Sequence, residues 1–269
     1  MSPAKKEELR RPKLGYALSG GAVRGAAHLG FLSVFEEAGI RPDLIAGTSA
    51  GAIVGAGYAA GLSVEQMSER VEASTWRQVT GSPRVPTLSV FDTTPLHKWL
   101  GGVLGDVEFE DLHVPLAAVT CNIVDGTMVV LRTGRVVDAV VASSAIPGLF
   151  APLERDGMFL VDGGVVNNLP VDVAKTIGAD VVIAVDVSPL REVRKPENLR
   201  DVLTSTVSIM SSGRQLESRR QADYLVVPDT ATFSTWDFGR VQEIIHAGRT
   251  AALTVVPEVL ALLKGYEGA

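Results

Sequence analysis

Short runs of apolar residues alternate with stretches of helical spacing along most of the chain. The apolar runs predict strands at 14–19, 44–46, 116–122, 128–131, 158–161, 180–187 and 224–227. Between them, hydrophobic residues recur every three or four positions, as in Leu29, Leu32 and Phe35, which is the period of an amphipathic helix. Strands that alternate with helices predict an α/β fold in which helices cover both faces of a mainly parallel sheet.

Glycines and capping residues mark the expected ends of the helices. Gly39, Gly61 and Gly178 close helices over 25–38, up to about residue 60, and over 170–177. Ser63 and Gln66 form a capping-box pattern that begins another helix. We expect further helices at 96–104 and 136–144, a long polar helix ending near residue 220, and two helices at the C-terminus. Prolines predict a loop at 81–90, and Asp125-Gly126 predicts a hairpin between two strands.

Composition narrows the kind of protein. Of the 269 residues, 46% are hydrophobic and 21% are charged, which excludes a disordered chain. The net charge of −6 argues against nucleic acid as a partner. A single cysteine, Cys121, excludes an internal disulfide and a cysteine-built zinc site, and it suits a reducing cytoplasm. We expect a polar tail at 1–12 and one domain over 13–269, with no metal and no cofactor.

One uncharged stretch, residues 44–64, is long enough to cross a bilayer. Only six of its 21 residues are Leu, Ile or Val, and most of the others are Gly, Ala, Ser or Thr. Such a stretch inserts poorly into lipid, so we expect a buried turn and helix here. We expect no secretory signal at the N-terminus, because an arginine and many glycines interrupt the apolar stretch there.

The segment Gly47-Thr48-Ser49-Ala50-Gly51 joins a predicted strand to a predicted helix. A G-x-S-x-G pattern in this context is typical of a nucleophile elbow. Gly47 and Gly51 let the strand and helix approach closely, and the Ser49 hydroxyl stands at a helix N-terminus, where developing negative charge is favoured. A second interpretation stays open, in which Ser49 only caps the helix.

A nucleophilic serine needs a base. In α/β-hydrolases, a carboxylate and then a histidine follow the serine in the chain. His28 precedes Ser49, His97 and His113 follow it early, and His246 alone fits this order. His246 also has the spacing of a residue on a helix face, so none of the histidines is a strong candidate for the base. A carboxylate base is therefore favoured.

Two glycine-rich segments complete the candidate chemistry. Residues 19–25 (S-G-G-A-V-R-G) join the first strand to the first helix, and successive N–H groups in such a turn suit an oxyanion or a phosphate. A dinucleotide-binding loop would need glycine in place of Ala22 and an acid in place of Gly47, so that interpretation fails twice. Asp162-Gly163-Gly164 follows another strand, and alone it is typical of a turn.

These three motifs, in this order, resemble the patatin-like phospholipase family. Segments 142–150 and 161–170 are similar to the family's sequence around its aspartate. The resemblance covers most of residues 14–187 and extends to 232–248. Ala22 differs from the third glycine that is usual in the family.

The resemblance implies a three-layer α/β/α fold and hydrolysis of acyl esters, commonly of phospholipids or lysophospholipids, through an acyl-enzyme. It implies a catalytic dyad without histidine, in which Ser49 is the nucleophile and Asp162 its base. The N–H groups of Gly20, Gly21 and Ala22 would form the oxyanion hole, supported by Arg24, Gly25, Gly47, Gly51, Gly163 and Gly164. Arg24 would hold the loop in place or neutralise a lipid phosphate.

Two other functions stay open: an α/β-hydrolase esterase with a Ser-Asp-His triad that uses His246, and a regulatory scaffold with weak activity. For a lipid ester substrate we expect a cytoplasmic protein whose contact with a membrane is peripheral. Basic residues could turn the active-site mouth towards an anionic lipid surface, or could simply be solvated. They are Arg191, Arg194, Lys195, Arg200, Arg214, Arg219 and Arg220.

Overall fold

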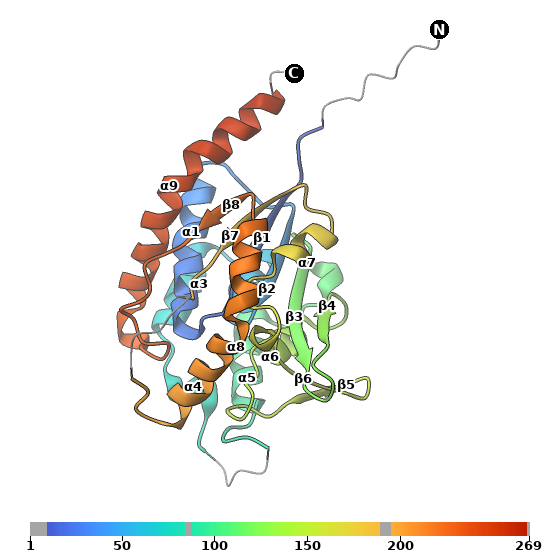
Figure 1. The fold of residues 1–269 in the computed structure, drawn as a ribbon, viewed down its shortest axis with the longest axis vertical. Coiled ribbons are helices and arrows are strands. Elements are labelled where there is room, and N and C mark those ends of the chain that lie inside the picture. Colours follow the sequence, from blue (N-terminus) through green and yellow to red (C-terminus); the bar gives the residue numbers. More distant parts are fainter. Residues whose placement is uncertain (1–9, 84–87, 189–194, 268–269) are drawn as a thin grey trace.

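In a computed structural model, the described residues, 10–83, 88–188 and 195–267, form an eight-stranded sheet between two layers of helices (Figure 1). The strand order is β5-β6-β3-β2-β1-β7-β8, and β4 pairs with β3 outside this path. The parallel part consists of β1 (Leu14–Leu18), β2 (Leu44–Thr48), β3 (Leu116–Asn122), β7 (Val181–Val185) and β8 (Tyr224–Val226). The antiparallel part adds β4 (Met128–Leu131), β5 (Leu153–Arg155) and β6 (Met158–Asp162).

Helices cover both faces of the sheet, which confirms the predicted three-layer α/β/α arrangement. One face carries α1 (Ala27–Glu37), α2 (Ala50–Ala59), α3 (Val64–Glu72), α5 (Thr94–Leu104), α6 (Val136–Ser143) and α9 (Val241–Glu267). The other carries α7 (Val171–Thr176) and α8 (Leu199–Gln221), while α4 (Trp76–Thr80) packs on α5. Short 3₁₀ turns lie at Ala22–Ala26, Phe109–Asp111, Gly163–Val165 and Phe238–Arg240.

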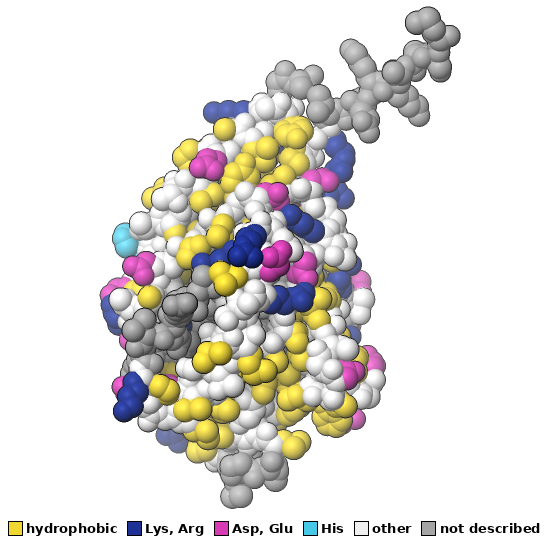
Figure 2. Space-filling model, in the orientation of Figure 1, with side chains coloured by type: hydrophobic (Ala, Val, Ile, Leu, Met, Phe, Trp, Pro, Cys, Tyr) yellow, Lys and Arg dark blue, Asp and Glu magenta, His cyan; other side chains and the backbone are white. Residues whose placement is uncertain are grey.

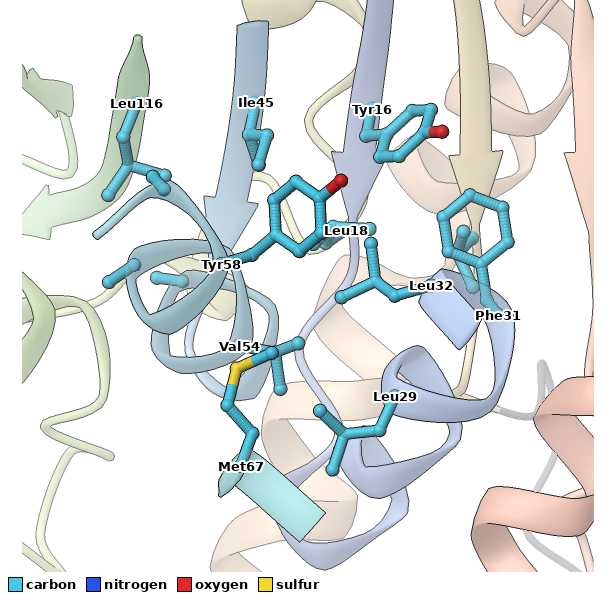
Figure 3. Packing of buried hydrophobic residues seen from close by; sticks show 14 of the residues in the cluster. Tyr16, Leu18, Leu29, Phe31, Leu32, Ile45, Val54, Tyr58, Met67 and Leu116 are labelled. Carbon is cyan, nitrogen blue, oxygen red and sulfur yellow. The ribbon is translucent and has the colours of Figure 1, made fainter. Parts of the chain in front are cut away.

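Alternate residues of β1 supply the cores on the two faces of the sheet. Tyr16 and Leu18 pack with α1 and α2 (Figure 3). Ala17 packs with α7 on the opposite face. The ring of Tyr16 meets the edge of Phe31 with centroids 4.9 Å apart, and its hydroxyl donates to the carbonyl of Ile40 at 3.3 Å. All five residues of β1 are buried, so the loop that follows this strand starts from a fixed point.

Helix α9 crosses α1 at very short range. A Cβ on Gly30 would lie 2.6 Å from the backbone nitrogen of Arg249, and one on Gly248 would lie 2.7 Å from the carbonyl carbon of Ala27, so both positions require glycine. Among the described residues, one helical run, Phe238–Tyr266, is long and apolar enough by length and composition to cross a membrane. The uncharged stretch 44–64 instead forms β2, the serine turn and α2, as predicted.

The predicted hairpin between β3 and β4 and the capping box at Ser63 are confirmed. The expectation of two C-terminal helices is wrong, because α9 continues through Pro257. Both Pro257 and Leu253 are exposed, so the carbonyl that loses its helical partner there faces water. The patterns also missed α4 and β5, which have five and three residues and are too short for a period to emerge. Residues 84–87 of the predicted loop lie outside the described residues.

Candidate active site

Ser49 occupies the sharp turn between β2 and α2. Its backbone has φ 53° and ψ −121°, a strained conformation for a residue with a side chain. The turn is possible because its neighbours are glycines: a Cβ on Gly47 would lie 2.7 Å from the backbone of Ala52, and one on Gly51 would overlap the carbonyl oxygen of Leu18. The predicted elbow geometry is therefore present.

The side chain of Ser49 does not cap α2, since no cap hydrogen bond is formed. The Ser49 hydroxyl instead donates to the carboxylate of Asp162. The Ser49 backbone N–H donates to Oγ of Ser143 at 2.9 Å, and Ser143 Oγ donates in turn to the Val119 carbonyl at 2.6 Å. The alternative interpretation of Ser49 as a simple helix cap is therefore wrong.

Asp162 is the last residue of β6 and is 4% exposed. Its Oδ1 accepts a hydrogen bond of 2.7 Å from the N–H of Gly164, and its own N–H donates to the Ala145 carbonyl at 2.9 Å. Burial raises the pKa of Asp162 to about 6, although the hydrogen bonds from Ser49 and Gly164 oppose that rise. A carboxylate with such a pKa is a better proton acceptor than an ordinary aspartate and is still mostly ionised at neutral pH.

The loop after β1 lies beside this pair, but its three predicted N–H donors are not equivalent. The N–H of Gly20 donates to the Asn168 carbonyl at 3.1 Å, so Gly20 does not supply a free donor in this structure. The described residues contain no partner for the N–H groups of Gly21 and Ala22. Of the three N–H groups that the resemblance assigns to an oxyanion hole, those of Gly21 and Ala22 are therefore without a described partner.

Ala22 has φ 49°, in the left-handed region that favours glycine. This conformation explains why the family usually has glycine at this position. Here the alanine stays in the same region at a cost of about 1–2 kcal/mol. The surrounding structure holds the loop there: Val23 N–H donates to the Thr235 carbonyl at 3.1 Å.

Arg24 connects this loop to the segment before α9. It is 5% exposed, and its Nε and Nη2 donate to the Phe233 carbonyl at 2.9 and 2.8 Å. These two bonds tie the glycine-rich loop to the segment before α9. Gly25 permits the next turn to approach α2, because a Cβ there would overlap that of Ala50. Gly163 likewise allows the aspartate loop to lie against the backbone of Val119.

A buried ion pair supports the other side of the loop, and the sequence patterns did not reveal it. Asp186, directly after β7, accepts hydrogen bonds from Arg219 Nε at 2.7 Å and from Gln215 Nε2 at 2.7 and 2.9 Å, both on α8. Its Oδ1 also accepts the N–H of Ser188 at 3.1 Å. Ser188 Oγ in turn donates to the Gly20 carbonyl at 2.7 Å. Asp186 thus links α8 to the glycine-rich loop.

The four histidines lie away from Ser49. His28 is fully buried, its Nε2 is 2.8 Å from the Ser19 carbonyl, and burial lowers its pKa to about 4. His97 pairs with Asp138 at 2.7 Å, and His113 packs beside Gly61. His246 lies on the exposed face of α9 and lines a separate groove, so no histidine lines the cavities that contain Ser49. In the part of the chain that the structure describes, no three His, Cys, Asp or Glu side chains gather where a metal could bind.

Two cavities meet at Ser49. The first, of about 590 Å³, contains the Asp162 side of the site and is lined by Gly20, Gly21, Ala22, Arg24, Ser49, Ile146, Asp162, Gly164, Asn168, Ser188, Thr204, Val207, Ser208, Ser211 and Thr235. The second, of about 780 Å³, shares Ser49, Ala22 and Ile146 with the first but is otherwise apolar and aromatic. Ser49 therefore stands between a hydroxyl-rich space and an apolar one.

Comparison with known proteins agrees with this geometry. The family model of the patatin-like phospholipases matches residues 16–175, so the chain belongs to this family. It is 32% identical over 87% of its length to patatin-like phospholipase domain-containing protein 7 of Rattus norvegicus, and 30% identical over 89% to lysophospholipase NTE1 of Scheffersomyces stipitis. The chain spans about a fifth of the length of these relatives, 20% and 18% respectively.

The fold is similar to that of VipD from Legionella pneumophila, which aligns with a TM-score of 0.53 over 93% of this chain and 67% of that one, at 12% identity. The match to the family model confirms the family resemblance inferred from the three motifs.

The predicted basic surface is only partly present. Arg219 is half-buried against Asp186, and the guanidinium of Arg200 stacks on Trp76 and Trp236 at 5.2 and 5.1 Å from the ring centroids. Lys195, Arg214 and Arg220 are exposed, while Arg191 and Arg194 lie outside the described residues. Arg200 and Arg219 thus serve the fold and are not free surface charges.

Proposed function

We propose that this protein is a serine acyl-ester hydrolase of lipid esters, in which Ser49 is the nucleophile and Asp162 the base. The observation that carries the proposal is a buried carboxylate of raised pKa, hydrogen-bonded to a serine in a strained turn at a helix N-terminus. Membership of the patatin-like phospholipase family supports the choice of a lipid ester as substrate. Because the dyad lacks histidine, Asp162 must accept the serine proton directly.

In the proposed reaction, Ser49 Oγ attacks the ester carbonyl carbon while its proton passes to Asp162. The carbonyl oxygen becomes an oxyanion that accepts hydrogen bonds from the N–H groups of Gly21 and Ala22, at about 3–4 kcal/mol per donor in comparable hydrolases. The ester C–O bond then breaks, and the proton on Asp162 passes to the leaving alcohol. Water, deprotonated by Asp162, repeats the sequence on the acyl-enzyme and releases the carboxylic acid.

The nucleophile is tested by covalent labelling. Incubation with a fluorophosphonate should add one phosphonyl group to the wild-type protein and none to Ser49→Ala, as read by intact-mass spectrometry. Ester hydrolysis by Ser49→Ala should fall by about 10⁴-fold or more, since loss of a catalytic serine costs at least this much in related chemistry. A correctly folded wild-type protein that takes no label would instead support the scaffold function.

The triad alternative has its own control. His246→Ala should keep hydrolysis within about twofold of wild type, because His246 is exposed on α9 and lines a different groove. A loss of about a thousandfold would instead indicate a triad, whose members contribute effects of that size.

We further propose that the protein meets lipid through the outer face of α8. Leu199, Val202, Ile209, Met210 and Leu216 lie on this helix with 41–73% of each residue exposed. No charged residue occurs between Val202 and Gly213, which is unusual for three turns of a surface helix. Hydrophobic side chains lie over α8 and below it in Figure 2. The inner face of the same helix lines the hydroxyl-rich cavity.

Vesicle co-sedimentation tests this contact. Replacement of both Ile209 and Met210 by Glu should lower the fraction bound to vesicles of mixed neutral and anionic phospholipid by about tenfold, because two exposed apolar side chains leave the interface. The control is Leu253→Glu, an equally exposed leucine on α9. Equal binding of all three proteins would reject α8 as the membrane-facing element.

A further inference from the structure

The apolar cavity beside Ser49 has a distinctive lining. It contains all three tryptophans of the chain, Trp76, Trp99 and Trp236, together with Phe150 and Phe238. The remaining lining comes mainly from aliphatic residues of α2, α3, α4 and α5: Ile53, Val54, Val71, Val79 and Leu96. Among the described residues, no Asp, Glu, Lys or Arg lines it.

The aromatic walls are fixed by contacts outside the cavity. The rings of Trp76 and Trp236 meet edge to face with centroids 4.6 Å apart, and Trp76 also meets Phe91 at 5.7 Å. Trp99 is held by a hydrogen bond of 2.9 Å from its Nε1 to Ser74 Oγ. These partners hold the three tryptophan rings in place.

Two polar atoms of the lining are buried without a partner among the described residues: Ser144 Oγ and Trp236 Nε1. Such groups cost about 1–3 kcal/mol each when they stay unpaired. A wholly apolar occupant would leave both unpaired, whereas a ligand with hydrogen-bonding oxygens at one end and a hydrocarbon tail could satisfy them. A fatty acyl ester has this construction.

We infer that the tryptophan-lined cavity is the acyl-chain subsite of the reaction. This inference rests on the proposed function. This assignment gives the orientation of the bound substrate. The hydrocarbon chain lies between Trp76, Trp99 and Trp236, the ester carbonyl lies at Ser49, and the alcohol lies in the hydroxyl-rich cavity. Thr204, Ser208 and Ser211 of α8 line the hydroxyl-rich cavity and can hydrogen-bond a polar alcohol.

The orientation of the substrate also determines which part of it stays bound after the acyl-enzyme has formed. The alcohol leaves through the hydroxyl-rich side, whereas the acyl group stays covalently bound to Ser49 with its chain held by the tryptophans. The substrate class is therefore an ester with one flexible hydrocarbon chain on the acyl side and a polar, hydrogen-bonding alcohol on the other. The residues that set acyl-chain preference are those of α3, α4 and α5, away from the dyad.

A direct binding test uses the tryptophans themselves. In Ser49→Ala, which cannot turn over substrate, a bromine-substituted twelve-carbon fatty acid below its micellar concentration should quench most of the tryptophan emission. The unbrominated acid should displace it and restore emission, and glycerophosphocholine should leave emission unchanged. Binding of the brominated acid by calorimetry without quenching would overturn the assignment, because the chain would then lie elsewhere.

A second test measures the kinetics of a variant whose tryptophan-lined cavity is narrower. Val79→Phe adds bulk to α4, and it should lower the ratio of kcat/KM for a dodecanoyl ester to that for an acetyl ester by at least about tenfold. Val227→Phe is the matched control, an exposed valine in a separate groove, and it should leave the ratio at the wild-type value. An unchanged ratio in Val79→Phe, with normal fluorophosphonate labelling, would reject the subsite and leave the proposed function intact. Absence of labelling in the wild type would reject the proposed function itself.

Discussion

Two buried aspartates at the carboxyl ends of strands, Asp162 and Asp186, differ sharply in their surroundings. They are 4% and 1% exposed, so burial alone does not distinguish them. Asp186 accepts hydrogen bonds from Gln215, Ser188 and the guanidinium of Arg219. Asp162 accepts them from one backbone N–H and one hydroxyl, and no described ion pair includes it.

The comparison shows what separates a structural carboxylate from a reactive one. A fully paired charge such as Asp186 holds neighbouring elements together, here the end of β7 and helix α8. A sparsely paired charge such as Asp162 has a desolvation cost, seen as its pKa of about 6, and under the proposed function that raised pKa makes it the better proton acceptor. The predictions below test whether the two residues have these separate roles.

The largest difference should appear in activity. Asp162→Asn should lower kcat/KM for ester hydrolysis by about a thousandfold or more, because an amide keeps the shape but cannot accept the serine proton. Asp186→Asn should lower it by about tenfold, through a less firmly held glycine-rich loop. Steady-state kinetics on both variants, with circular dichroism to confirm folding, checks this. Equal losses would show that the two carboxylates do not have separate roles.

Stability should show the opposite order. Asp186→Asn should lower the free energy of unfolding by about 3 kcal/mol, because it leaves the half-buried guanidinium of Arg219 without its charge partner. Urea unfolding at pH 8 measures the change. The control is Arg220→Ala, which breaks an exposed pair with Glu217 and should cost less than about 0.5 kcal/mol. Similar costs for both variants would mean that the buried pair does not hold α8 to the sheet.

The effect on stability at Asp162 should be no larger and of opposite sign, a gain. The folded protein binds the Asp162 proton more tightly than the unfolded chain does, so ionisation of this residue costs stability. That cost appears as the pH rises from about 4 to about 6 and persists above it. Asp162→Asn removes the cost and should raise the free energy of unfolding by up to about 3 kcal/mol at pH 8, but by little at pH 4. A gain that does not depend on pH would show that ionisation is not its source.

The sequence predicts the parts of the site that depend on local geometry. Gly47 and Gly51 reveal the elbow because a strained serine turn needs small neighbours within two residues of Ser49. The layered fold follows from alternating periods, and the sheet pairings of β1, β2 and β3 agree with it. Structural features that depend on residues within about five positions of one another could be predicted from the sequence.

Contacts between distant segments could not be foreseen. The hydrogen bond from Gly20 to Asn168 joins residues far apart in the chain, and only the fold reveals that it uses an N–H expected for the oxyanion. The Asp186–Arg219 pair connects a strand end to a helix, and nothing in either local pattern indicates burial. The tryptophan cavity is likewise assembled from α4, α5 and the segment before α9, so no single motif predicts it.

The central position of β1 has a consequence for the moment at which this protein becomes active during synthesis. β1 pairs with β7, and Ser19 and Gly20, just after β1, bond to Val185, Asn168 and Ser188. A ribosome therefore delivers Ser49 and Asp162 before the strand that fixes the glycine-rich loop. Contacts between such distant segments form late, because loop-closure entropy opposes them until both ends exist. Under the proposed function, the nascent chain would therefore carry Ser49 and Asp162 before its glycine-rich loop is fixed, and hydrolysis would begin only after β7 has emerged and paired with β1.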